Sequence, residues 1–180
     1  MVADPAKSEL KDWTELVPES EAVLSGAQVI GGKLFLTYDK DASNHAYVYG
    51  LDGKQLQEIN LPSLGTVGFS GDKDDKECFF SFTSFTIPGT TYKYDMDKNT
   101  YELFRAPKVD FDADAFVTEQ VFYPSKDGTK IPMFLTYKKD LKKNGTNPVY
   151  LYGYGGFNIS LNPGFSAMRI PFLENGGIYA

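Results

Sequence analysis

The sequence predicts a mixed fold, in which about two four-stranded antiparallel blades of a β-propeller are followed by the N-terminal part of an α/β-hydrolase sheet. Three observations support this prediction. Two segments repeat the same order of short extended stretches, the pattern changes after Pro107, and a glycine-rich loop then follows a short apolar run. We therefore expect two domains: the C-terminal blades of a β-propeller over residues 1–107, and the start of an α/β-hydrolase catalytic domain, truncated before its nucleophile, over residues 108–180.

The first repeat contains four stretches rich in β-branched and aromatic residues, separated by turn signals such as Gly31-Gly32 and Asp52-Gly53. We expect strands at residues 22–30, 33–38, 45–49 and 55–61, with the polar residues 39–44 as a turn. Residues 5–16 carry apolar residues at helical spacing over only one or two turns, so they are predicted to be a connector into the first blade.

The second repeat predicts strands at residues 66–70, 76–83, 90–94 and 100–105, again separated by turn residues. Three landmarks of the first repeat recur 45 residues later: Tyr47 as Tyr92, Asp52 as Asp97, and Pro62 as Pro107. Four strands in each repeat of this length are typical of propeller blades. A small two-sheet β-sandwich is the alternative for this half, and the regular offset favours the blades.

Two blades cannot close a ring, because closure takes about 4 to 8 blades and is what hides the sheet edges. We therefore expect this chain to be a piece of a longer protein.

After Pro107 the spacing changes. Residues 117–123 and 131–137 predict a hairpin around Asp127-Gly128, and residues 148–152 form a short apolar run typical of buried strands. Glycines then dominate residues 153–156, residues 166–175 predict a helix, and residues 178–180 begin another apolar run. Hairpin, strand, glycine loop, helix and strand is the order in which an α/β-hydrolase sheet begins.

The usual catalytic patterns are missing from this sequence. Residues 68–72 resemble a G-x-S-x-G nucleophile elbow but end in Asp72, and His45 is the only histidine, so no Ser/His/Asp triad is available. The acidic residues 110–114 lack the glycine and the glutamate of a calcium loop and are predicted to be a linker. No nucleotide motif is complete. We expect no cofactor and no metal.

Composition narrows the choice of partners. The formal net charge is -6, no basic cluster lies among aromatic residues, and no apolar stretch approaches the length of a membrane span, so nucleic acid and membrane are not expected partners. The one cysteine, Cys78, lies in an apolar run and is predicted to be a buried structural thiol. A cytoplasmic location is expected, or a periplasmic one if a leader has been removed.

Residues 121–134, followed by residues 151–160 with their Tyr-Gly-Gly-Phe sequence, closely resemble the prolyl oligopeptidase family of serine peptidases. The resemblance extends upstream through Asp12-Trp13 and residues 16–19, 68–71 and 82–85, so it covers nearly the whole chain. It implies a serine endopeptidase that cleaves short peptides on the carboxyl side of proline, with a propeller lid that excludes folded proteins.

The resemblance also implies roles for two residues of the glycine loop. In the family the tyrosine of the motif donates its hydroxyl to the oxyanion of the tetrahedral intermediate, a role that carries over to Tyr154, and the phenylalanine lines the substrate pocket, which carries over to Phe157. The alternative is that both aromatic side chains simply pack a core.

The family's catalytic serine, aspartate and histidine follow later than Ala180, so the isolated chain is predicted to be inactive. Its expected partners are proline-containing short peptides and the remainder of the catalytic domain. The alternative function is a non-catalytic propeller-type module that binds a peptide or protein, but such a module needs enough blades to close, and only two are visible here.

Overall fold

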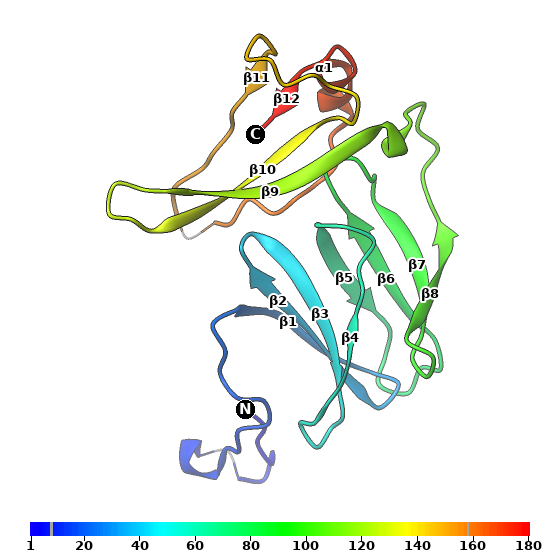
Figure 1. The fold of residues 1–180 in the computed structure, drawn as a ribbon. Coiled ribbons are helices and arrows are strands. Elements are labelled where there is room, and N and C mark those ends of the chain that lie inside the picture. The colour runs from blue at the N-terminus through cyan, green and yellow to red at the C-terminus, as the bar shows by residue number, and fades with distance from the viewer. Residues whose placement is uncertain (8, 158) are drawn as a thin grey trace.

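The structure is a computed structural model that describes residues 1–7, 9–157 and 159–180. It contains three four-stranded sheets that follow one another along the chain (Figure 1). The first two are antiparallel and share one hydrophobic core, and the third lies across one end of them. No helix among the described residues is long and apolar enough to cross a bilayer.

The first sheet is an antiparallel meander, as the sequence predicts. Its strands are β1 (Val23–Ile30), β2 (Lys33–Lys40), β3 (Ser43–Tyr49) and β4 (Gln55–Ile59), in that spatial order. The expected turn at residues 39–44 is shorter than predicted. Lys40 pairs with Ser43, which leaves only Asp41 and Ala42 in the turn, with φ of 51° and 59°. Positive φ at both turn residues suits the twist of a two-residue hairpin.

The second sheet repeats this layout. Its strands are β5 (Thr66–Ser70), β6 (Cys78–Thr83), β7 (Thr90–Asp95) and β8 (Thr100–Arg105), again in meander order. All four strands fall within one or two residues of their predicted bounds. The nucleophile-like residues 68–72 begin inside β5, so they form blade structure as expected.

The core lies between the two antiparallel sheets. Its buried members come from both: Ile30, Phe35, Ala46, Val48, Ile59, Val67, Cys78, Phe80, Phe82 and Tyr94. Aromatic rings make much of the contact, as in the pair Phe35 and Phe69, whose centroids are 5.0 Å apart. Cys78 is fully buried, and this burial raises the pKa of its thiol to about 12, which confirms a structural thiol.

The opposite face of the first sheet has its own small cluster. Leu34, Leu36 and Tyr38 are buried there, and Leu16 at the end of the N-terminal connector and the adjacent Val17 pack against them. The connector itself contains one short 3-10 helix, η1 (Leu10–Asp12), rather than a longer helix. Its role in the fold is therefore to cover part of the exposed face of the first sheet.

The third sheet mixes parallel and antiparallel strands. They are β9 (Phe116–Pro124), β10 (Lys130–Lys138), β11 (Val149–Tyr150) and β12 (Ile178–Tyr179), in the spatial order β11-β12-β10-β9. The predicted hairpin is β9 and β10, preceded by the 3-10 turn η2 (Ala113–Ala115). The predicted helix is the 3-10 turn η3 (Ala167–Arg169) continued by the single α-helical turn α1 (Ile170–Glu174).

The prediction of a buried strand at residues 148–152 is wrong. Only Val149 and Tyr150 are paired, and this run is exposed, with Leu151 71% accessible. The reason is topological, because β11 is the edge of the sheet and only β12 flanks it within the described chain. An apolar run therefore lies in solvent here.

The third sheet is joined to the blades through residues 162–165, which we call the strap. Asn162 Nδ2 donates to Asp39 Oδ1 at 3.0 Å, Thr66 Oγ1 donates to the carbonyl oxygen of Pro163 at 2.8 Å, and the backbone N–H of Phe165 donates to Thr83 Oγ1 at 3.1 Å. The strap thus bonds to both blades.

Aromatic packing reinforces this junction. The Phe85 ring, which follows β6, lies 5.4 Å from the Phe134 ring and 5.6 Å from the Tyr179 ring of the third sheet. The Arg169 guanidinium lies 4.0 Å above the Tyr179 ring and 5.2 Å from the Phe85 ring, while its Nη1 donates to the carbonyl oxygen of Gly164. Side chains from three segments therefore meet at one contact.

Candidate functional site

The glycine-rich loop, residues 151–157, begins at the carboxyl end of β11. Backbone bonds fix its start, because Tyr152 N donates to the Ala180 oxygen and Ala180 N donates to the Tyr150 oxygen, both at 2.9 Å. β11 and β12 are parallel, so their carboxyl ends lie at the same edge of the sheet. Ligands of open α/β sheets bind beyond this edge, which makes the loop a candidate site.

Tyr154 lies in this loop with its side chain half exposed, at 48%. Its ring rests over Gly156, where an added Cβ would be 3.5 Å from the Tyr154 hydroxyl oxygen, an ordinary contact. No hydrogen bond joins that hydroxyl to any of the residues that the structure describes. Within the described chain the Tyr154 side chain is therefore not packed in a core, and its role stays a prediction.

Phe157 is the most exposed aromatic residue of the loop, at 91%, and its φ is +54°. Non-glycine residues rarely adopt this left-handed conformation, and such strain gathers at ligand-binding segments. Phe157 lines a shallow hollow of about 250 Å³ together with Gly155, Gly156, Ile159 and Ser160. Within the described chain the Phe157 side chain is not packed in a core, and among the described residues that line this hollow Ile159 is the other apolar side chain.

Charged and nucleophilic residues considered in the sequence lie apart from the loop. His45 lies in β3, and its Nδ1 is 3.9 Å from Glu58 Oε1 of the neighbouring strand. Asp112 accepts the backbone N–H of Asp114 at 3.0 Å and so caps the turn η2. Within the described part of the chain, no three His, Cys, Asp or Glu side chains are grouped closely enough to hold a metal.

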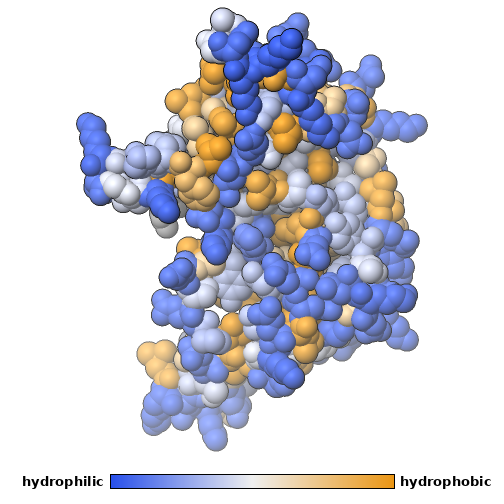
Figure 2. Space-filling model, viewed as in Figure 1, coloured by the Kyte–Doolittle hydropathy of each residue, from blue (hydrophilic) through white to orange (hydrophobic). Residues whose placement is uncertain are grey.

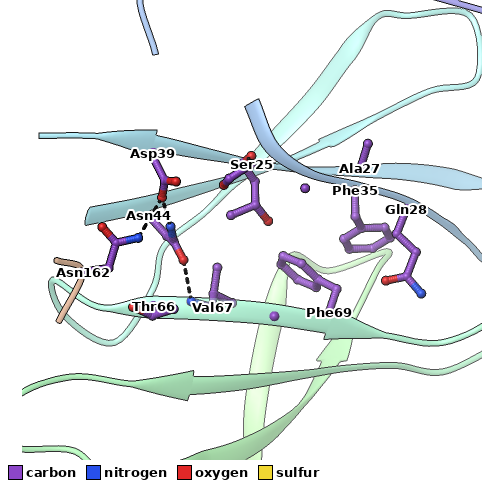
Figure 3. Close-up of a pocket in the computed structure, with 13 residues that line it drawn as sticks. Ser25, Ala27, Gln28, Phe35, Asp39, Asn44, Thr66, Val67, Phe69 and Asn162 are labelled. Carbon is purple, nitrogen blue, oxygen red and sulfur yellow. Dashed lines mark hydrogen bonds between the residues drawn. The ribbon is translucent and has the colours of Figure 1, made fainter. Parts of the chain in front are cut away.

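A larger cavity, of about 430 Å³, lies between the two blades. Its polar end is formed by Asp39, Asn44 and Asn162, and its apolar end by Phe35 and Phe69 (Figure 3). The sequence analysis missed this group, because Asp39 and Asn162 are 123 residues apart and neither belongs to a motif.

Comparison with protein families matches residues 1–107 to the model described as the N-terminal β-propeller domain of prolyl oligopeptidase. Among curated proteins, the chain is 47% identical over 180 residues to a prolyl endopeptidase of Elizabethkingia miricola, covering 99% of this chain and 25% of that protein. It is 37% identical to a prolyl endopeptidase of Dictyostelium discoideum, covering 97% of this chain and 23% of that protein.

Solved structures give the same result. One from a structural and mechanistic study of two prolyl endopeptidases has a TM-score of 0.90 at 41% identity, covering 98% of this chain and 26% of the other. Unliganded prolyl oligopeptidase B from Galerina marginata has a TM-score of 0.79 at 31% identity, covering 90% of this chain and 24% of the other. The chain spans about a quarter of the length of the relatives it matches.

Proposed function

The chain belongs to the prolyl oligopeptidase family, and from this premise we propose that it is part of a serine endopeptidase that hydrolyses short peptides on the carboxyl side of proline. In this proposal residues 1–107 supply propeller blades and residues 108–180 begin the α/β-hydrolase domain. The similarity to prolyl endopeptidases over 99% of the chain supports the second part, because it extends well beyond residue 107.

The proposed contribution to the chemistry is the hydroxyl of Tyr154. Acyl transfer from a peptide passes through a tetrahedral intermediate with a negatively charged oxygen, and a fixed donor directed at that oxygen is worth about 2.7 to 4 kcal/mol of barrier. The observation that carries this assignment is that Tyr154 is half exposed beyond the carboxyl ends of two parallel strands, with its hydroxyl bonded to no described residue.

Phe157 is proposed to form an apolar wall for the substrate's proline. Its exposure of 91% supports this role, since a large ring held in solvent by a strained backbone has no packing function of its own in this chain. Proline presents an apolar ring, so an aromatic wall is a suitable partner.

The attacking group is not among the residues of this sequence, which has one histidine and no nucleophile elbow. The purified chain is therefore expected to give no turnover of a chromogenic Gly-Pro substrate. Appreciable hydrolysis by the chain alone would contradict the proposal that it supplies an oxyanion donor without a catalytic triad.

The direct test places this chain between the residues that precede and follow the matched segment in the Elizabethkingia miricola prolyl endopeptidase, because its two blades cannot close a propeller by themselves. In this hybrid, Tyr154→Phe should lower kcat by about 10² to 10³, with a much smaller change in KM, because the bond forms mainly in the transition state. Tyr152→Phe is the matched control, since Tyr152 is 50% exposed in the same loop. Equal activity of the Tyr154 variant and the control would reject the assignment.

A further inference from the structure

The cavity between the blades, which we call the inter-blade pocket, is walled by the first strand of each blade. β1 contributes Ser25, Gly26, Ala27 and Gln28, and β5 contributes Thr66, Val67, Gly68 and Phe69. The close-up shows Asp39, Asn44 and Asn162 at one end, and the two phenylalanine rings with Gln28 beside them at the other (Figure 3). A pocket with an apolar body and a few convergent polar groups is the usual form of a small-ligand site.

The polar end has a carboxylate without a counter-ion. Asp39 Oδ1 accepts hydrogen bonds from the side-chain amides of Asn44 and Asn162. Among the described residues, Asp39 takes part in none of the ion pairs. The two amides orient the carboxylate but leave its charge uncompensated, so a cationic donor placed here would form a charge-assisted hydrogen bond.

The apolar end has room kept open by a glycine. Gly26 lies opposite Thr37 in the β1–β2 pairing, and a Cβ added to it would meet only Thr37, at 3.5 Å. The β1–β2 register shifts between Leu24 and Gly26, so the glycine lies at a bulge, and its φ is not in the left-handed region. The missing side chain leaves this part of the pocket wall open. The walls beyond it are Phe35 and Phe69.

The surroundings add negative charge. An adjoining hollow of about 530 Å³ shares Asp39 and Asn162 with the inter-blade pocket, and it is also lined by Glu21, Asp41 and Lys40. Three carboxylates against one ammonium give these two hollows an excess of negative charge. The space-filling view shows the surface hollowed between the β9–β10 hairpin and the blades (Figure 2). Such a lining concentrates cations near the pocket.

The two wall strands also offer backbone groups. β1 pairs only with β2, and β5 pairs only with β6, so within the described chain each has one edge outside the sheet ladder. On the β5 edge the Val67 N–H is already bonded to Asn44 Oδ1, and the other groups of these edges are offered to a ligand. An extended peptide can bond to such an edge, whereas a small amine cannot use more than one or two of these groups.

We propose that the inter-blade pocket binds a primary ammonium group carried on an apolar body, with Asp39 as its counter-ion. An ammonium group supplies three N–H donors and the positive charge that the polar end lacks, and the apolar body would lie against Phe69. Both the free amino terminus of a short peptide and a small arylalkylamine have this chemistry. The site uses blade residues together with Asn162 of the strap, and it does not depend on the role of Tyr154.

Isothermal titration calorimetry of the chain at low salt tests the proposal with three probes: the amide of Phe-Ala-Ala with a free amino terminus, its N-acetylated form, and 2-phenylethylamine. The free peptide should bind at least about 10-fold more tightly than the acetylated one, because acetylation removes the charge and two donors. Tighter binding of the peptide than of the amine assigns the site to peptide termini, and the reverse assigns it to small amines.

Two variants locate the site. Asp39→Asn should weaken binding of the free peptide by about 10-fold while leaving the acetylated form unchanged, and Asp41→Asn, which removes a charge two residues away, should change it by less than about 2-fold. Gly26→Val should weaken the binding of all three probes by filling the pocket. This variant remains informative if Asp39→Asn lowers the melting temperature too far for titration. Equal affinity of free and acetylated peptides, or no effect of Gly26→Val, would overturn the proposal, as would no binding below about 10 mM.

Discussion

Asn44 Oδ1 accepts a hydrogen bond of 2.8 Å from the backbone N–H of Val67, and this bond links the first blade to the first strand of the second. The backbone N–H of Asn44 also donates to the Gly65 oxygen at 3.0 Å. Asn44 is buried, at 8% exposure. Its side-chain oxygen therefore takes the place of water as the acceptor for a backbone N–H at the edge of β5. The two blades are therefore joined by polar bonds as well as by their common core.

Asn44→Ala should lower the free energy of unfolding by about 1 to 3 kcal/mol, because it leaves the Val67 N–H buried without an acceptor. Urea denaturation followed by circular dichroism measures the change. Asn60→Ala is the control, since Asn60 is exposed, and it should shift stability by less than about 0.5 kcal/mol. If the two variants unfold at the same urea concentration, the link between the blades is not an important source of stability.

Ala42→Gly should raise the free energy of unfolding by about 1 kcal/mol. Ala42 occupies the left-handed region, with φ of 59°, where a Cβ is unfavourable, and glycine removes that strain at some cost in chain entropy. Thermal melting detects the gain. The same substitution at Ala106, which has a negative φ, should give no gain. A loss of stability at position 42 would show that the turn is not strained.

Stability should fall as pH rises above about 9. Burial raises the pKa of the Cys78 thiol from 9.0 to about 12, and burial also raises the pKa of Tyr94. Between pH 9 and 12 the unfolded thiol loses its proton while the folded one keeps it, so unfolding releases a proton and the folded state loses about 1.4 kcal/mol per pH unit from this group.

Urea midpoints measured between pH 7 and 11 test this dependence. Cys78→Ala should be less stable at neutral pH, through lost packing, but its stability should fall less steeply above pH 9 than that of the parent chain. Parallel slopes for the two proteins would mean that the thiol is not the group responsible.

Arg169→Leu should weaken the attachment of the third sheet to the second blade, because it removes the cation over the Tyr179 ring and the bond to Gly164. The expected loss is about 1 to 2 kcal/mol, and Arg169→Lys should recover only part of it, since lysine lacks the planar group that stacks on a ring. Amide hydrogen exchange in β12 should be slowest in the parent chain, faster in Arg169→Lys and fastest in Arg169→Leu. Full rescue by lysine would assign the effect to charge alone.

The eight blade strands could be predicted because each short stretch carries its own signals. Landmarks such as Tyr47 and Tyr92 recur at a fixed spacing, and β-branched or aromatic residues end at glycine or aspartate turns. The β2–β3 turn was placed with less accuracy, since nothing in the polar residues 39–44 shows that Asp41 and Ala42 alone adopt the left-handed conformation.

The features that could not be predicted from the sequence depend on contacts between residues far apart in the chain. An apolar composition at Leu151 predicts burial only if a neighbouring strand covers it, and the described chain provides none on that side. Tyr154 and Phe157 were found through a resemblance rather than from spacing, and their roles stay predictions. The group around Asp39 could not be predicted, because the amide of Asn162 comes from the strap of the third sheet.

The bond between Asp39 and Asn162 sets an order of events during synthesis. Asn162 follows Asp39 by 123 residues, so at about 5 to 20 residues per second the ribosome adds it roughly 6 to 25 s later. Strands form in a small fraction of that time, so both blades have time to fold before their last polar partner is made. A pause in translation beyond the second blade would therefore leave a nascent chain with Asp39 still solvated and the strap not yet in place.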